Sequence, residues 1–247
     1  MSGHSKWATI KHKKAKTDAT RGKVFTKIIR EITTAAKIGG GDVSGNPRLR
    51  LAVEKAKEAN MPNDNIKRAI DKGVGGGAAA MEELSYEGYG PGGVALMIDV
   101  LTDNRNRAAS EIRNILEKGG GNMGASGCVS YMFKRKGSML FDKAGIDEEA
   151  LTMAAIDAGA EDILPEETVF GVVTTPENFE KVRDALRAKG FSPLSSEVTM
   201  VPDTTVKVTG ENAQKVLKLV DALEESDDVQ AVHANFDIPD EIIEKSS

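Results

Sequence analysis

The spacing of apolar residues predicts a helix within the first 40 residues. Between Lys23 and Lys37 they recur every three or four positions, as one side of a helix requires: Phe25, Ile28, Ile29, Ile32, Ala35 and Ala36. Basic residues occupy the opposite side: Lys23, Lys27, Arg30 and Lys37. Arg21 falls on the apolar side, so we expect the helix to begin at or after Arg21.

Two further helices are predicted before residue 75. Asn46-Pro47 can begin one, because asparagine caps helix N-termini and proline is favoured at the first helical position. This helix ends before Met61-Pro62, and the third runs from Asn63 or Asp64 to Gly73. The glycine-rich stretch at 73–80 is typical of a linker.

Strands and helices alternate after the linker. We expect a strand at 94–101, a helix at 104–118, and strands at 128–134 and 205–209. A helix at 211–224 and a strand at 229–236 follow. Segment 137–201, in the middle, has the order strand, helix, strand, strand, helix, strand, which is that of a ferredoxin-like unit.

These elements predict an α+β fold, in which an N-terminal helical domain precedes two ferredoxin-like α/β domains. One of those domains is inserted into the other. We expect a basic helical domain at 1–75, a discontinuous domain at 81–134 plus 203–240, and an inserted domain at 135–202.

Charge is distributed unevenly between these parts. Residues 1–75 contain 17 Lys/Arg and 7 Asp/Glu, a formal charge of +10, while the remainder contains 16 Lys/Arg and 31 Asp/Glu, a charge of −15. Such asymmetry indicates that one end of the protein has a polyanionic partner.

The first 30 residues hold nine Lys/Arg against one acid, Asp18. A solvated charged surface is the alternative interpretation, but the near absence of acids that could pair with these cations favours binding to phosphates. The predicted nucleic-acid-binding residues are Lys6, Lys11, His12, Lys13, Lys14, Lys16, Arg21, Lys23, Lys27, Arg30 and Lys37.

The sequence shows no convincing catalytic, metal-binding or nucleotide-binding motif. We therefore expect that the protein is not an enzyme and that it binds no cofactor and no metal. The histidines His4, His12 and His233 lack metal-ligand spacing and are interpreted as surface or phosphate-contacting residues. The run GGGNMG at 119–124 matches GxGxxG formally. It closes a predicted helix instead of opening one, so we discount nucleotide binding. We expect the carboxylates at 224, 225, 227 and 228 to be solvated.

The single cysteine, Cys128, rules out an intramolecular disulfide and favours a reducing compartment. No apolar run is long enough for a signal peptide core or a membrane span. We therefore expect a cytoplasmic protein without membrane contact.

Several long motifs resemble the YebC family. They are GHSKW at 3–7, KHKKAKTDATRGKVFTKIIREI at 11–32, AAKIGGGD at 35–42, NPRLR at 46–50, YEGYGPGG at 86–93, DNRNR at 103–107 and GGNMGASGCVSYMF at 120–133. That family includes bacterial proteins described as probable transcriptional regulators and the mitochondrial translational activator of cytochrome c oxidase. The resemblance implies three domains and nucleic-acid binding without catalysis.

Two targets follow from the charge pattern and the resemblance. The first is DNA, bound by a transcriptional regulator through its basic N-terminal segment. The alternative is ribosomal RNA of the large subunit, bound by a ribosome-associated translation factor. In both cases we expect the acidic α/β part to be repelled from the phosphates, which leaves it available to a ribosome or protein partner.

Overall fold

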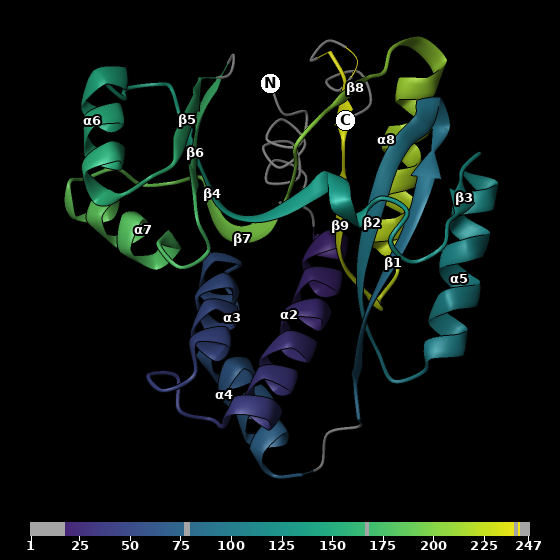
Figure 1. Cartoon of the computed structure of the whole chain (residues 1–247). Coiled ribbons are helices and arrows are strands. Elements are labelled where there is room, and N and C mark those ends of the chain that lie inside the picture. The colour runs from purple at the N-terminus through teal and green to yellow at the C-terminus, as the bar shows by residue number, and fades with distance from the viewer. Residues whose placement is uncertain (1–17, 77–79, 166–167, 240–241, 243–247) are drawn as a thin grey trace.

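The protein is α+β in the computed structural model, which describes residues 18–76, 80–165, 168–239 and 242. Among the described residues, three helices come first: α2 (Asp18–Gly39), α3 (Pro47–Glu58) and α4 (Asn63–Val74). Two four-stranded sheets with their own helices follow (Figure 1). The predicted fold class is therefore confirmed.

The three N-terminal helices form a bundle with its own apolar core. Its buried residues include Ile28, Ile32, Leu49 and Ile66. Asn46 caps α3, because its side-chain oxygen accepts a hydrogen bond from the backbone N–H of Leu49 at 3.1 Å. The same side chain donates to the carbonyl oxygens of residues 35 and 40, which fixes the connection from α2 to α3.

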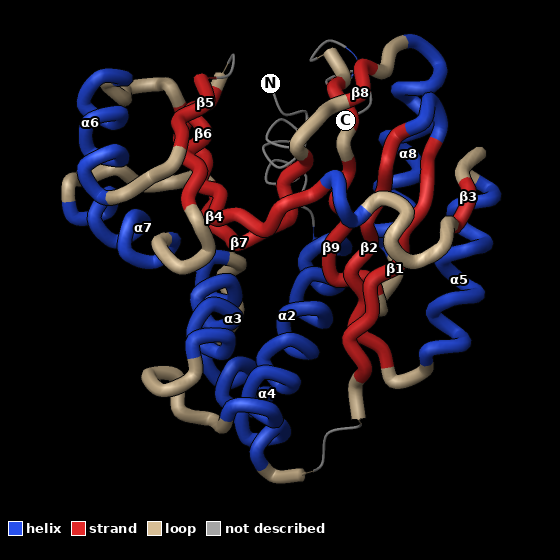
Figure 2. Tube along the Cα trace, viewed as in Figure 1, coloured by secondary structure: helices blue, strands red, loops and turns tan. Residues whose placement is uncertain are grey.

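The first sheet has the strand order β3-β1-β2-β9. Its strands are β1 (Glu82–Gly90), β2 (Val94–Thr102), β3 (Asn122–Met123) and β9 (Val229–Ala234), and neighbouring strands are antiparallel. Helices α5 (Arg105–Lys118) and α8 (Gly210–Glu225) pack on one face of this sheet (Figures 1 and 2). The core between them is aliphatic and includes Ile98, Ile112 and Val220.

The second sheet has the strand order β5-β6-β4-β7. Its elements are β4 (Phe133–Asp142), α6 (Glu148–Ala158), β5 (Asp162–Pro165), β6 (Val169–Thr174), α7 (Phe179–Ala188) and β7 (Ser195–Pro202). The neighbouring strands are antiparallel, so this unit has the ferredoxin-like arrangement that its element order predicts. All four strands lie in sequence between β3 and β9 of the first sheet.

Two short strands form a separate parallel pair, β8 (Val206–Lys207) with β10 (Phe236–Asp237). Two 3₁₀ turns complete the elements of the described chain, η1 (Pro91–Gly93) and η2 (Ser130–Met132). The predicted strand at 205–209 therefore exists in shortened form, but it does not join the first sheet.

The predicted strand at 128–134 is wrong. Residues 128–132 form a turn and η2, and the strand that follows, β4, belongs to the second sheet. The cause is Glu87 on β1, whose carboxylate accepts hydrogen bonds from the backbone N–H groups of Gly127, Val129 and Ser130 at 2.7–2.8 Å. In the first sheet, the strands next to β2 are β1 and β9 and not the predicted strand at 128–134. We did not predict β1.

Two predicted helix ends also differ. Helix α2 begins at Asp18, three residues before Arg21. Helix α4 runs one residue past Gly73, to Val74, and Gly73 is buried against α2. A Cβ atom at Gly73 would lie 2.5 Å from the carbonyl oxygen of Thr33, so glycine permits the close approach of the two helices.

The helical bundle contacts both sheets through charged side chains. On α3, Arg50, Glu54 and Glu58 pair in turn with Glu180, Arg183 and Arg187 of α7. The pairs recur at each turn of the two helices, which run in the same direction. We call this set the α3–α7 contact. Arg48, also on α3, joins Glu31 of α2 to Glu83 of β1.

Candidate nucleic-acid interface

The basic side of α2 faces the end of α8 and the turn that follows it. The Nζ atom of Lys27 donates to the carbonyl oxygen of Glu224 at 2.5 Å, and Nη1 of Arg30 donates to that of Asp227 at 2.6 Å. Lys23 lies 4.0 Å from the carboxylate of Glu225. We call this set, together with the Arg30–Asp228 pair described next, the α2–α8 contact.

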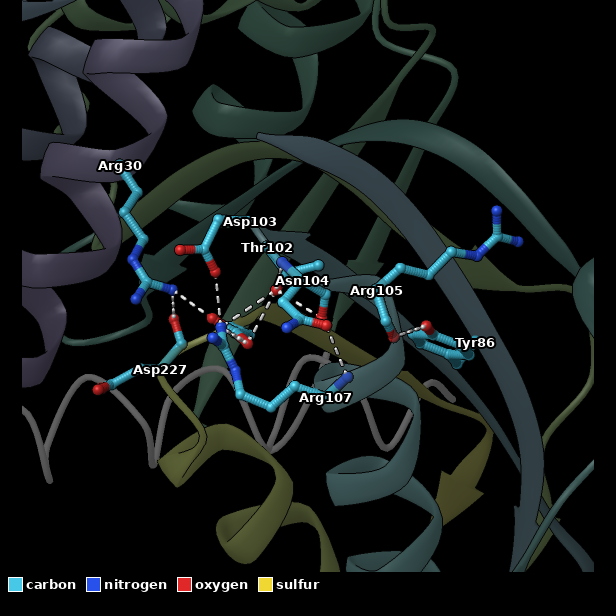
Figure 3. A network of polar contacts seen from close by, with 9 residues as sticks. Arg30, Tyr86, Thr102, Asp103, Asn104, Arg105, Arg107 and Asp227 are labelled. Carbon is cyan, nitrogen blue, oxygen red and sulfur yellow. Dashed lines mark hydrogen bonds and ion pairs between the residues drawn. The ribbon is translucent and has the colours of Figure 1, made fainter. Parts of the chain in front are cut away.

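Asp228 is the central acceptor of this region. It is only 4% exposed, and it accepts hydrogen bonds from Arg30 (2.7 Å), Arg107 (2.8 Å) and Thr102 (3.0 Å). Arg107 also binds Asp103 at 2.8 Å. Figure 3 shows Arg30 reaching this cluster from α2, while Arg107 reaches it from the first turn of α5. The expectation that this carboxylate is solvated is therefore wrong.

Two opposing effects determine the pKa of Asp228. Burial by itself would raise it, but the hydrogen bonds from Arg107, Arg30 and Thr102 outweigh burial and hold the pKa below its ordinary value. The carboxylate is therefore ionised at neutral pH, and a buried ionised group needs its cationic partners.

The end of α8 attracts cations for a further reason. The last carbonyl groups of a helix have no partner within it, and they form the negative end of the helix dipole. Helix α8 has no basic residue in its last turn, and the sequence there is EESDD at 224–228. Lys27 of α2 supplies one of the missing donors from another part of the chain, and Arg30 binds the carbonyl oxygen of Asp227 in the turn just beyond the helix.

The structure brings together only part of the predicted interface. Lys23, Lys27 and Arg30 lie side by side on α2, and Lys37 is exposed at the far end of the same helix. Arg21 is in the first turn of α2, but its side chain lies outside the described residues. Six predicted residues precede the described chain: Lys6, Lys11, His12, Lys13, Lys14 and Lys16.

Several basic residues were missed by sequence reasoning. Lys67, Arg68 and Lys72 are exposed on α4, and their spacing of one, four and five residues could have placed them on one side of that helix. Arg107 was visible only as part of DNRNR. No local pattern indicated that it contacts Asp228, which is 121 residues away.

His233 is not a surface residue, contrary to expectation. It is 4% exposed, and its Nε2 lies 2.9 Å from Oδ2 of Asp99. Its Nδ1 lies 3.3 Å from Oγ1 of Thr199 on β7, so the ring connects the two sheets. The glycines at 119–121 follow α5 and lead into β3, which confirms the helix-ending context that argued against a nucleotide site.

Within the described part of the chain, no group of three or more His, Cys, Asp or Glu residues could hold a metal ion. No described helix is both long and apolar enough to cross a bilayer.

Comparison with known proteins covers nearly the whole chain. A model of the TACO1/YebC N-terminal domain matches residues 5–76, and one of the TACO1/YebC second and third domains matches residues 81–236. A crystal structure of a conserved hypothetical protein from Aquifex aeolicus superposes with a TM-score of 0.84 at 52% identity. It covers 93% of this chain and 95% of its own.

Curated relatives are similar over their full length. A protein of Syntrophus aciditrophicus is 56% identical over 100% of both chains, and one of Geotalea uraniireducens is 58% identical over 99% of both. Each is named a probable transcriptional regulatory protein. With two family models and relatives of this similarity, the chain belongs to the TACO1/YebC family.

Proposed function

We propose that this protein is a non-enzymatic, cytoplasmic regulator of gene expression that binds DNA through the phosphate backbone. The observation that carries the proposal is the cation excess of the first 30 residues, nine Lys/Arg against one acid. Such a segment binds polyanions because each neutralised phosphate releases condensed counterions. The names of the relatives, probable transcriptional regulatory proteins, support a role in transcription.

The contacts in this mode go to phosphates and not to base edges. Lysines on a helix or an N-terminal segment position a protein on a duplex without reading its sequence. The exposed cations of α4, Lys67, Arg68 and Lys72, add to the positive charge of the helical bundle. The acidic α/β part is left to meet other partners.

Replacing four lysines of the N-terminal segment tests the proposal. We expect K11Q/K13Q/K14Q/K16Q to weaken binding to unrelated DNA duplexes equally. The slope of log K against log salt should become less steep by about 0.9 for each phosphate that the variant no longer neutralises. The matched control is K118Q/K181Q/K207Q/K218Q, which removes the same charge from exposed positions of the α/β part. Equal effects of the two variants, or affinity independent of salt, would contradict the proposal.

The alternative target is large-subunit ribosomal RNA, bound by a translation factor. The ferredoxin-like strand order of the second sheet supports it, since RNA-binding domains share this topology, although fold analogy does not identify a ligand. Ultraviolet crosslinking in cells, followed by sequencing of the recovered nucleic acid, separates the two. Promoter DNA supports the transcriptional role, and enrichment of ribosomal RNA replaces it with the translational one.

A further inference from the structure

Part of the predicted phosphate-binding surface is already occupied by anionic groups of the same chain. Lys27 and Arg30 donate to the carbonyl oxygens of Glu224 and Asp227, and Arg30 also binds the carboxylate of Asp228. The first acceptor is a carbonyl at the negative end of α8 and the other two lie in the turn just beyond it, within a segment that contains four acids and no base. Phosphodiester oxygens have the same chemistry and would use the same donors.

Little apolar contact holds α2 against α8. The apolar core of the helical bundle and the core between the first sheet and α5/α8 have no residue in common. Separation of α2 from α8 would therefore expose little apolar surface. The other pair that we describe between the bundle and the first sheet, Arg48–Glu83, is solvent-exposed and contributes little.

The other side of the bundle is attached more firmly. Leu51 of α3 packs against the core of the second sheet, and Arg183 of α7 has a side chain only 5% exposed. The α3–α7 contact can therefore persist while α2 leaves α8, with α3 remaining on α7.

We infer that the segment Glu224–Asp228 is an internal competitor of nucleic acid, which must displace it from Lys27 and Arg30 in order to bind α2 fully. The inference rests on the proposed function and adds its regulation. In the closed form, the acidic segment occupies these cations and limits contact with weakly bound polyanions. In the open form, both cations face phosphates, and α2 has moved away from α8.

A reversible crosslink tests this directly in the full-length chain. Cysteines replace Lys23 and Glu225, whose charged atoms lie 4.0 Å apart, in a C128A background. A bis-methanethiosulfonate reagent joins them, and reduction releases them. We expect the crosslinked protein to bind a 30-base-pair duplex at least tenfold more weakly than the same protein after reduction, which is the matched control.

Charge neutralisation gives a second, independent measurement. We expect E224Q/E225Q/D227N to bind the duplex about fivefold more tightly than E148Q/E149Q/D157N, which removes the same charge from α6. Asp228 is left in place because the Arg107 contact depends on it.

Equal binding by the crosslinked and reduced forms would overturn the inference, as would equal affinity of the two triple variants. Failure of the proposed function has a different signature. In that case the wild-type protein binds neither a DNA duplex nor a ribosomal RNA fragment at low salt, and the inference falls with it.

Discussion

The helical bundle is held against the rest of the chain on two sides, and the two contacts differ in what they bury. In the α3–α7 contact, side chains pair with side chains, and Leu51 adds an apolar anchor. In the α2–α8 contact, α2 supplies cations, and its partners are two backbone carbonyl groups, the buried carboxylate of Asp228 and the exposed carboxylate of Glu225. The first contact is specified by two complementary helices, and the second by the charge of a helix end.

Because of this difference, the α3–α7 contact keeps the bundle attached, while the oxygens of the α2–α8 contact can be replaced by other anions. A paired and partly apolar contact separates only when the side chains on both helices are left without partners. A cation at a helix end can exchange one oxygen for another, because what it recognises is negative charge in a suitable position. The protein thus has one joint that keeps the bundle in place and one that another anion can open.

The largest effect is expected from breaking the least exposed pair of the α3–α7 contact, Glu54–Arg183. Glu54→Ala removes a partner of Arg183, whose side chain is 5% exposed, and should lower the free energy of unfolding by about 3 kcal/mol. The control is Asp184→Ala, which removes the exposed partner of the same arginine and should cost less than about 1 kcal/mol. Urea denaturation measures both, and equal reductions in stability would show that burial of Arg183 does not matter.

A smaller effect, dependent on pH, is expected at the α2–α8 contact. Because its folded-state pKa is lowered, Asp228 stabilises the protein fully above the ordinary aspartate pKa of about 3.9. That contribution is lost as the pH falls through the lower pKa of the folded state. We expect Asp228→Asn to cost about 2 kcal/mol at pH 7 and progressively less toward pH 2. Thermal unfolding of both proteins across this range measures it, and a pH-independent difference would contradict the assignment.

The smallest effect is expected at the exposed end of the α3–α7 contact. Arg187 and Glu58 are 41% and 47% exposed and lie 3.2 Å apart. A double-mutant cycle with alanine at both positions should give a coupling of about 0.5 kcal/mol that disappears in 1 M salt. A coupling above about 2 kcal/mol would mean that the exposed pair is as strong as the Arg183–Glu54 pair, so that burial does not distinguish the two.

Local signals predicted much of the fold. Asn46-Pro47 begins α3 as expected, and the periodicity of 137–201 predicted the elements of the second sheet. The failures have distant causes. Residues 127–130 are shaped by Glu87, about 40 residues earlier, and Asp228 accepts a hydrogen bond from Arg30, 198 residues away. Periodicity describes one element at a time, so it cannot reveal a carboxylate whose partners come from other elements.

The candidate site also contains residues that the sequence predicts and contacts that only the packing of distant elements creates. Helical spacing and the local excess of basic residues identified the cations of α2, because both are visible in the sequence. Their neighbours were not visible, since the contact of α2 with the end of α8 depends on how the bundle packs against the first sheet. The division of the chain into three domains and the roles of the lysines before residue 18 stay predictions.

The chain enters the second sheet through β4 and leaves it through β7, and these two strands are neighbours. Phe133 and Pro202 are register partners on β4 and β7, so the points of exit and return lie about 5 Å apart. A linker of about three residues spans that gap. Excision there would take the α3–α7 contact away and leave the strands of the first sheet joined in their present order. Any replacement grafted there must keep two contacts with the host: Phe133 lies in one buried cluster with Ala95 and Met97 of β2, and Thr199 of β7 faces His233 of β9.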